Sequence, residues 1–218
     1  MSTLIPNRFL FRFELPIHRA AKGLPVAGDV DAWGERYLLP PLCTIDDQEP
    51  FGQVYAAWNE GGLYVGCRVE GKSRALRCDP QNFRQSDCLR LMTDMRDTRD
   101  IRRATRFCQH FYILPSGGGP KGREACAGSA KISRATQDAP LVSPGDIIVA
   151  SALKKSGYML TAHLPSHVLS GFDPAENTRI GFYYMLEDTE LGQQALTIGD
   201  DLNWWIDPST WATAVLTE

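Results

Sequence analysis

A short hairpin between residues 53 and 69 places the strongest limit on the fold of this chain. Residues 53–58 (QVYAAW) and residues 63–69 (LYVGCRV) are rich in the β-branched and aromatic residues that favour strands. The residues between them, Asn59-Glu60-Gly61-Gly62, form a turn sequence in which the glycines supply a positive φ. The pattern predicts two antiparallel strands joined by a tight turn.

Further short strands are predicted along the rest of the chain. In residues 8–15 the apolar residues Phe9, Phe11, Phe13 and Leu15 alternate with their neighbours, which is typical of a half-buried strand. The remaining predicted strands are residues 88–93, 107–114, 147–153, 158–164, 179–186 and 211–216, and residues 116–128 are expected to form a flexible glycine-rich loop.

The segments between these strands are rich in Gly, Pro and Asp, and none shows the long 3.6-residue period of an amphipathic helix. One short helical turn is predicted at residues 165–169, because Pro165 is tolerated at a helix start. The sequence therefore predicts an all-β fold: an antiparallel, jelly-roll-like β-sandwich with long loops and at most short helical turns. Since no repeat or linker divides the chain, residues 1–218 are expected to form a single domain.

Composition excludes several classes of partner. The 218 residues carry a net charge of -3 and are 43% hydrophobic, which is sufficient for a core of their own. A slightly acidic chain is not expected to bind nucleic acid or an anionic membrane. No apolar run reaches the roughly 20 residues that a membrane helix needs.

Six cysteines bear on the cellular compartment: Cys43, Cys67, Cys78, Cys88, Cys108 and Cys126. They form no C-x-x-C pair, and the first sixteen residues carry Arg8 and Arg12 inside the apolar stretch, unlike a signal peptide. We therefore expect reduced, mostly buried thiols and favour the cytoplasm. The alternative is disulfides in an exported protein.

Residues 94–106 form a highly charged connection between two predicted strands. Asp94, Asp97 and Asp100 recur every three residues and alternate with arginines. Oxygen ligands at such spacing partly resemble a calcium loop, but the interleaved arginines would repel a cation. A self-paired ion loop is favoured, and an anion or sugar-hydroxyl clamp is the other alternative.

No catalytic or cofactor motif stands out. Gly117, Gly119 and Gly122 match G-x-G-x-x-G, but no amphipathic helix follows to meet a pyrophosphate. Cys108 and His110 share one face of a predicted strand, yet two ligands are too few for a metal site, so the metal content is left open. With no nucleophile and base in evidence, we expect a protein that is not an enzyme.

The pair Trp204-Trp205 lies among Asp and Asn residues. Adjacent residues of an extended segment point to opposite faces, so one ring is expected in the core and the other in solvent. An exposed ring among polar side chains suits a sugar, whose apolar C–H face stacks on the ring while its hydroxyls form hydrogen bonds. Packing of both rings is the alternative.

Six segments, taken together and in order, resemble the family 9 carbohydrate-binding modules. The resemblance covers most of the chain from residue 25 on. The segments are residues 28–34; the hairpin 54–69 with AWNEGGLYV; 86–94 beginning SDCL; 157–165 beginning GYML; 179–188 beginning RIGF; and 207–216 beginning DPS.

The resemblance implies a β-sandwich that binds sugar without catalysis, commonly as an appendage of a secreted glycosidase and often with structural calcium. In xylanase-linked members the sugar lies between two tryptophans. The one before the final Asp-Pro matches Trp205, whereas the other falls near Phe83-Arg84, and a sugar-binding glutamate corresponds to Arg90. The changed residues are compatible with a charged sugar, another small ligand or loss of sugar binding.

The resulting hypothesis is a carbohydrate-binding protein that holds a saccharide or similar small ligand. Trp205 would stack on the ligand, Phe83 would form part of the opposite wall, and Arg84, Arg90 and His110 would make polar contacts. The alternative is a structural or protein-interaction domain, in which the charged loop binds a protein partner.

Overall fold

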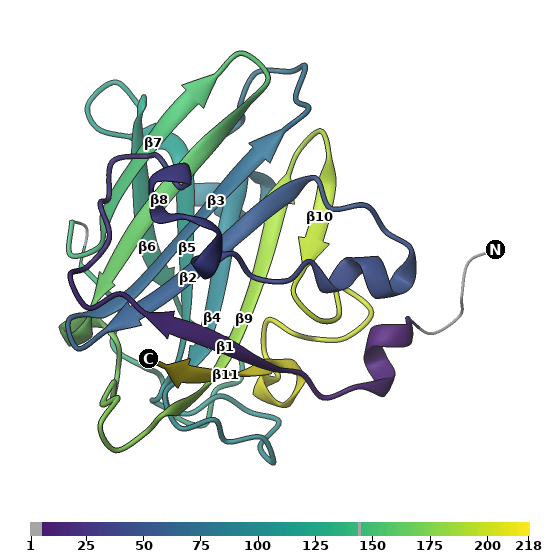
Figure 1. Ribbon diagram of the computed structural model, residues 1–218, viewed down its shortest axis with the longest axis vertical. Helices are drawn as coiled ribbons and strands as arrows, with labels where there is room; N and C mark the ends of the chain where they lie inside the picture. The colour runs from purple at the N-terminus through teal and green to yellow at the C-terminus, as the bar shows by residue number, and fades with distance from the viewer. Residues whose placement is uncertain (1–5, 144) are drawn as a thin grey trace.

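The computed structural model describes residues 6–143 and 145–218, and over these residues the fold is all-β (Figure 1). Its strands are β1 (Glu14–Arg19), β2 (Gly52–Asn59), β3 (Gly62–Glu70), β4 (Cys88–Asp94), β5 (Cys108–Gly118), β6 (Glu124–Ala130), β7 (Ile148–Lys154), β8 (Gly157–Pro165), β9 (Arg179–Asp188), β10 (Gly192–Ala195) and β11 (Ala212–Thr217).

Helical structure in the described residues is limited to short 3-10 turns, as predicted. These are η1 (Asn7–Leu10), η2 (Asp31–Trp33), η3 (Glu35–Tyr37), η4 (Leu42–Asp46), η5 (Pro80–Gln85), η6 (Ser166–Val168) and η7 (Pro208–Thr210). None of them is long and apolar enough to cross a membrane.

One continuous sheet contains all the named strands, in the order β6-β5-β4-β9-β11-β1-β2-β3-β8-β7, with β10 added on β9. β1 runs parallel to both of its neighbours, β11 and β2, and joins the two halves of the sheet. The sheet curls until its end strands β6 and β7 approach each other, which gives a nearly closed, barrel-like shape (Figure 1). The all-β class is confirmed, whereas a division into the two sheets of a jelly-roll sandwich is not.

The hairpins that the sequence predicted most directly are present. β2 and β3 pair over their whole length around the turn before Gly62, whose φ is 140°. β7 and β8 form a second hairpin, β4 and β5 flank the charged loop, and η6 begins directly after Pro165. These elements depend on local turn chemistry, which is visible in the sequence.

The N-terminal prediction was wrong. The strand expected at residues 8–15 is replaced by η1 and an extended segment, and β1 begins only at Glu14. Phe9 and Phe11 are 50% and 58% exposed, so their alternation does not mark a buried strand face. Pro16 lies where β1 pairs with β11 alone, a position at which a sheet tolerates proline. The first sixteen residues were predicted not to form a signal peptide, and the first five of them, Met1–Ile5, lie outside the described residues.

The predicted glycine-rich loop at residues 116–128 is largely a hairpin. β5 continues to Gly118, the chain turns, and β6 returns from Glu124. Gly117 and Gly122 have φ values of 101° and 63°, which explains the glycines as turn residues rather than as a sign of flexibility. A Cβ at Gly128 would lie 2.4 Å from the hydroxyl of Tyr112, so this glycine makes room for an aromatic ring.

β4 is buried on both faces, and this places the candidate site. Leu89 and Leu91 point into the main core between the two halves of the sheet. Cys88, on the opposite face, packs with Phe83 of η5 and Leu114 of β5. The outer face of β4 is therefore covered by other segments of the chain, and charged residues placed there leave bulk water. Four of the six cysteines are buried, as expected.

Candidate functional site

Arg90 is the centre of a charged group on the outer face of β4. It lies directly across from Tyr112 of β5 and Met185 of β9. Because side chains alternate along a strand, Arg90 points away from the main core, toward the same side as Cys88 and its neighbour across the ladder, Glu187. Three neighbouring strands thus bring together residues that are far apart in sequence.

The guanidinium of Arg90 is buried and donates three hydrogen bonds. Its Nη1 donates to both carboxylate oxygens of Glu187, each at 3.2 Å, and its Nε donates to His110 Nε2 at 3.2 Å. The guanidinium carbon also lies 4.4 Å from the centre of the Trp204 ring. We call Arg90, His110 and Glu187 the Arg90 group. Charge-assisted hydrogen bonds and a cation–π contact compensate for the loss of hydration.

Burial shifts the pKa values of both hydrogen-bond partners of Arg90, His110 and Glu187. It is the main reason why the pKa of His110 falls well below its usual value, and the positive charges of Arg90 and Arg84 add to this effect. A neutral ring is what a histidine nitrogen needs in order to accept a hydrogen bond from arginine. Burial also raises the pKa of Glu187, although the charge of Arg90 acts in the opposite direction.

Phe83 lies beneath an exposed arginine rather than in an open wall. Its ring is 8% exposed and stacks on Tyr112, with ring centres 4.4 Å apart. The guanidinium carbon of Arg84 lies over the same ring at 5.0 Å, and that of Arg90 at 5.7 Å. Phe83 is thus an apolar support for two guanidinium groups, of which only that of Arg84 reaches solvent.

The two adjacent tryptophans have different environments. Trp204 is buried, stacks on Tyr183, and donates its indole N–H to Asp200 at 3.1 Å. Trp205 is 37% exposed, and its ring meets that of Trp204 nearly at a right angle, with centres 5.9 Å apart. One buried and one exposed ring confirm the predicted division, although the segment is a turn and not extended.

The five residues singled out in the sequence belong to one chain of contacts. Arg90 touches His110, Phe83 and Trp204 directly; Arg84 joins through Phe83, and Trp205 joins through Trp204. Sequence reasoning missed Glu187, Tyr112 and the exposed Gln193, whose amide donates to Glu187 at 3.2 Å. Glu187 of β9 thus places a carboxylate beside Arg90.

A second buried charge lies close by, at Lys72. Its Nζ is 2.7 and 2.6 Å from the two carboxylate oxygens of Asp188, 3.2 Å from Asp87 and 4.0 Å from Glu190. Burial acts to lower the pKa of Lys72, but the hydrogen bond to Asp188 and the two aspartate charges raise it. We call Lys72, Asp87, Asp188 and Glu190 the Lys72 cluster.

The Lys72 cluster bears on the structural calcium that the resemblance implies. Here an ammonium group supplies the positive charge among the carboxylates. Across residues 6–143 and 145–218, no group of three His, Cys, Asp or Glu side chains is placed to hold a metal ion. Bound calcium therefore stays a prediction, without a ligand set in the described part of the chain.

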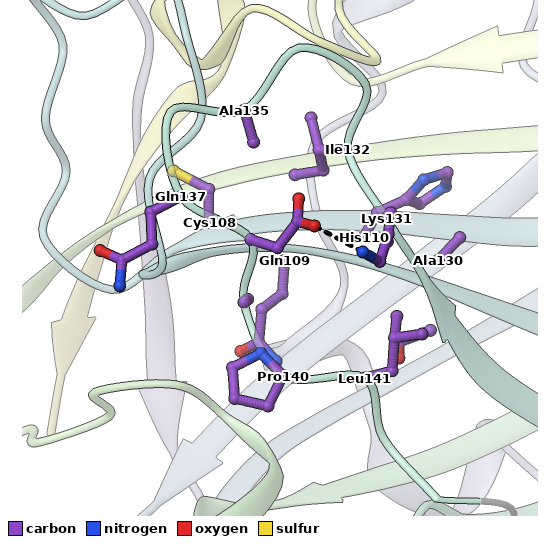
Figure 2. Close-up of a pocket in the computed structure, with 13 residues that line it drawn as sticks. Cys108, Gln109, His110, Ala130, Lys131, Ile132, Ala135, Gln137, Pro140 and Leu141 are labelled. Carbon is purple, nitrogen blue, oxygen red and sulfur yellow. Dashed lines mark hydrogen bonds and ion pairs between the residues drawn. The ribbon is translucent and has the colours of Figure 1, made fainter.

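The pair Cys108 and His110 does not converge on a common point. Both border a small cavity between β5, β6 and residues 131–141, but in Figure 2 the His110 ring points away from its centre. Cys108 Sγ instead accepts a hydrogen bond from the Thr105 backbone. Two other residues that line this cavity, Lys131 and Asp138, form an ion pair at 2.6 Å.

The charged loop is self-paired only in part. Arg99 pairs with Asp97 at 3.3 Å, while Asp94 accepts hydrogen bonds from the Arg96 and Thr98 backbone N–H groups. The side chain of Arg96 donates to two carbonyl oxygens. Arg102 and Arg103 are exposed and form no ion pair with any described residue.

Comparison with solved structures shows which known proteins share this fold. A family 9 carbohydrate-binding module from Caldicellulosiruptor kristjanssonii, solved with cellotriose, superposes with a TM-score of 0.63 at 13% identity over 94% of both chains. The chain has the fold of these modules. The glucose complex of the module gives a TM-score of 0.64 over 94% of this chain and 95% of the module, again at 13% identity.

A candidate carbohydrate-binding protein from Bacteroides uniformis also superposes, with a TM-score of 0.59 and 11% identity over 95% of this chain and all of the other. No family model matches the sequence, and no curated protein matches it either. The predicted resemblance is thus confirmed at the level of the fold, at low sequence identity.

Proposed function

We propose that this protein binds a saccharide without catalysing a reaction on it, by stacking the sugar on Trp205. The observation that carries the proposal is the exposed Trp205 ring, held edge-on by the buried Trp204 next to the Arg90 group. The fold adds support, because the modules that share it were solved with cellotriose and with glucose.

The surroundings of Trp205 suit such a ligand. Trp204 cannot turn freely, since Tyr183 stacks on it and both Asp200 and Arg90 contact it, so it offers a rigid support for its neighbour. A rigid aromatic ring loses little entropy on binding. Polar groups near the Arg90 group that reach solvent, Arg84 and Gln193, are available for hydroxyls.

In this proposal the buried residues act from beneath. Arg90 and His110 are already hydrogen-bonded to each other, and Arg90 to Glu187. They would hold Trp204 and Phe83 in place. Because Arg90 and His110 are buried, they would contact a ligand directly only where the exposed side chains around them do not cover them. Phe83 would contribute through Arg84, which lies over its ring.

Titration calorimetry with glucose and cellotriose tests the proposal. We expect Trp205→Ala to weaken binding about tenfold or more, because stacking on an aromatic ring is the main apolar contact. Leu153→Ala is the matched control, since Leu153 is an exposed apolar residue of β7 and takes no part in the Arg90 group. Thermal unfolding of each variant checks that the fold is kept.

Equal binding by wild type and Trp205→Ala would contradict the stacking role. Absence of binding by wild type to these sugars and to a xylo-oligosaccharide would contradict the proposed function. That second result would favour the alternative of a protein-interaction domain. Exchange of Arg102 and Arg103 for glutamate would then test that alternative, with light scattering or a pull-down as the measurement.

A further inference from the structure

We propose that a second, independent site, whose lining does not include Trp205, binds an anionic sugar of the uronic-acid class. The site is a cavity of about 380 Å³, within the range that small-molecule sites occupy. Three parts of the chain line it: residues 8–13, the charged loop, and the segment that contains η7.

The positive charge of this cavity is its first distinguishing feature. Arg8, Arg12, Arg99 and Arg102 line it, against a single lining carboxylate, that of Asp207. Asp207 is itself engaged, since it accepts hydrogen bonds from the backbone and the hydroxyl of Ser209, at 3.0 and 2.6 Å. An excess of arginine in a cavity favours a carboxylate, which a guanidinium can bind through two hydrogen bonds.

The four arginines divide into two fixed and two available groups. Arg8 is buried, with Nε 2.5 Å from Asp46 Oδ2 and Nη1 3.0 Å from the carbonyl oxygen of Ala195. Arg99 pairs with Asp97 and donates to Phe13 and Thr213.

Arg12 and Arg102, by contrast, are exposed and pair with no carboxylate in the described part of the chain. The fixed pair shapes the cavity, and the available pair can take up an anion.

Exposed aromatic rings are the second distinguishing feature. Phe9 and Phe11 border the cavity and are half exposed or more, which is unusual for rings of this size. Phe11 lies 6.1 Å from Phe13, ring centre to ring centre. An apolar ring face beside arginines matches a ligand that is itself apolar on one face and anionic at one end. Ser209 and Thr210 add hydroxyl groups.

A uronic acid combines these properties in one molecule: a pyranose face of C–H groups, hydroxyls, and one carboxylate. A phosphate or sulfate alone would leave the aromatic rings without a partner, and a neutral sugar would leave Arg12 and Arg102 without one. The inference stands on different residues from the Trp205 proposal and does not depend on it.

Titration calorimetry with glucuronate tests the inference, with glucose as its neutral counterpart and acetate as the carboxylate alone. We expect glucuronate to bind at least about tenfold more tightly than either, and more weakly as salt concentration rises. The double variant Arg12→Ala/Arg102→Ala is expected to weaken glucuronate binding about tenfold or more, and Phe11→Ala several-fold.

Two controls keep the result interpretable. Lys131→Ala removes an exposed positive charge elsewhere and should leave glucuronate binding unchanged. Trp205→Ala should also leave it unchanged, which separates this site from the first. The inference is overturned if the double arginine variant binds glucuronate as wild type does, if acetate binds as tightly as glucuronate, or if Trp205→Ala alone abolishes binding. A wild type that binds no glucuronate overturns it as well.

Discussion

The Lys72 cluster and the Arg90 group are two buried charges, placed at the same end of β4 and β9, with different access to solvent. Asp87 directly precedes β4 and belongs to the Lys72 cluster. The last two residues of β9 are divided between the two groups: Glu187 pairs with Arg90, and Asp188 pairs with Lys72. Around Lys72 the carboxylates of Asp87 and Asp188 also accept hydrogen bonds from the backbone N–H groups of Arg77, Thr189 and Leu191. The cluster is closed in the sense that these carboxylate oxygens are engaged within the protein.

The Arg90 group is open on one side. Its contacts lead outward to Arg84, Gln193 and Trp205, all exposed. Burial of a charge therefore does not by itself mark a binding site. A closed cluster stabilises the fold, whereas a group with exposed neighbours can also serve a ligand. The predictions that follow test this distinction, beginning with the closed cluster.

Replacement of Lys72 by methionine should have the largest effect on stability. It leaves Asp87 and Asp188 buried without their cation, and breaking a buried ion pair in this way costs about 3–5 kcal/mol. Urea unfolding measures the loss. Lys131→Met, which removes an exposed partner of Asp138, is the control and should cost about 1 kcal/mol or less. Equal losses in the two variants would show that the Lys72 cluster is not a structural unit.

Glu187→Gln should cost less than the Lys72 variant. It keeps the shape of the side chain but removes the charge that faces Arg90, and the expected loss is about 1–3 kcal/mol, the penalty of a weakened buried hydrogen bond to a charged group. Because the carboxylate is already disfavoured by burial, its removal recovers part of a desolvation cost. A loss that matches the Lys72 variant in urea unfolding would contradict the ordering.

His110 predicts a dependence of stability on pH. Its pKa in the folded protein lies well below the ordinary value, so below about pH 6.5 the unfolded chain binds a proton that the folded chain does not. Stability is therefore complete above that pH and falls as the pH falls, by about 1.4 kcal/mol at pH 5.5.

Urea unfolding of wild type and His110→Gln between pH 7.5 and 5.5 measures this term. Glutamine keeps an acceptor for Arg90 but does not titrate, so the variant should lack this part of the pH dependence. His163, whose pKa burial also lowers, contributes equally to both proteins and cancels in the comparison. Identical pH profiles for the two proteins would exclude His110 as the source.

Trp205→Ala should have the smallest effect on stability. The ring is partly in solvent, and substitutions of such residues usually change stability by about 0.5 kcal/mol, in contrast to the several kcal/mol expected for the buried Trp204. Thermal unfolding of Trp205→Ala beside Trp204→Ala measures the contrast. A large loss for Trp205→Ala would assign the ring to the fold and not to the ligand.

Prediction from the sequence succeeded where structure is local. The hairpin that ends at Glu70 depends on a turn four residues long, and the order of segments was sufficient to indicate the fold. Prediction failed where the paired residues are distant in sequence. Arg90 was identified, but its partner Glu187 lies 97 residues away on β9. The alternation of apolar and polar residues within a strand does not show which other strand lies next to it. Phe9 and Phe11 alternate like a strand, yet Phe9 lies in η1 and Phe11 follows it, and both lie outside the strands of the described residues.

The position of β1 has a consequence for the order in which the molecule folds. β1 is the first strand and pairs along its length with the last, β11, so the two halves of the sheet are joined only once residues 212–217 exist. During synthesis the hairpin of β2 and β3 can form early and can pair with the end of β1 at His18 and Arg19, but the longer pairing of β1 must wait until β11 has been made. Such distant pairing slows folding and leaves strand edges exposed meanwhile.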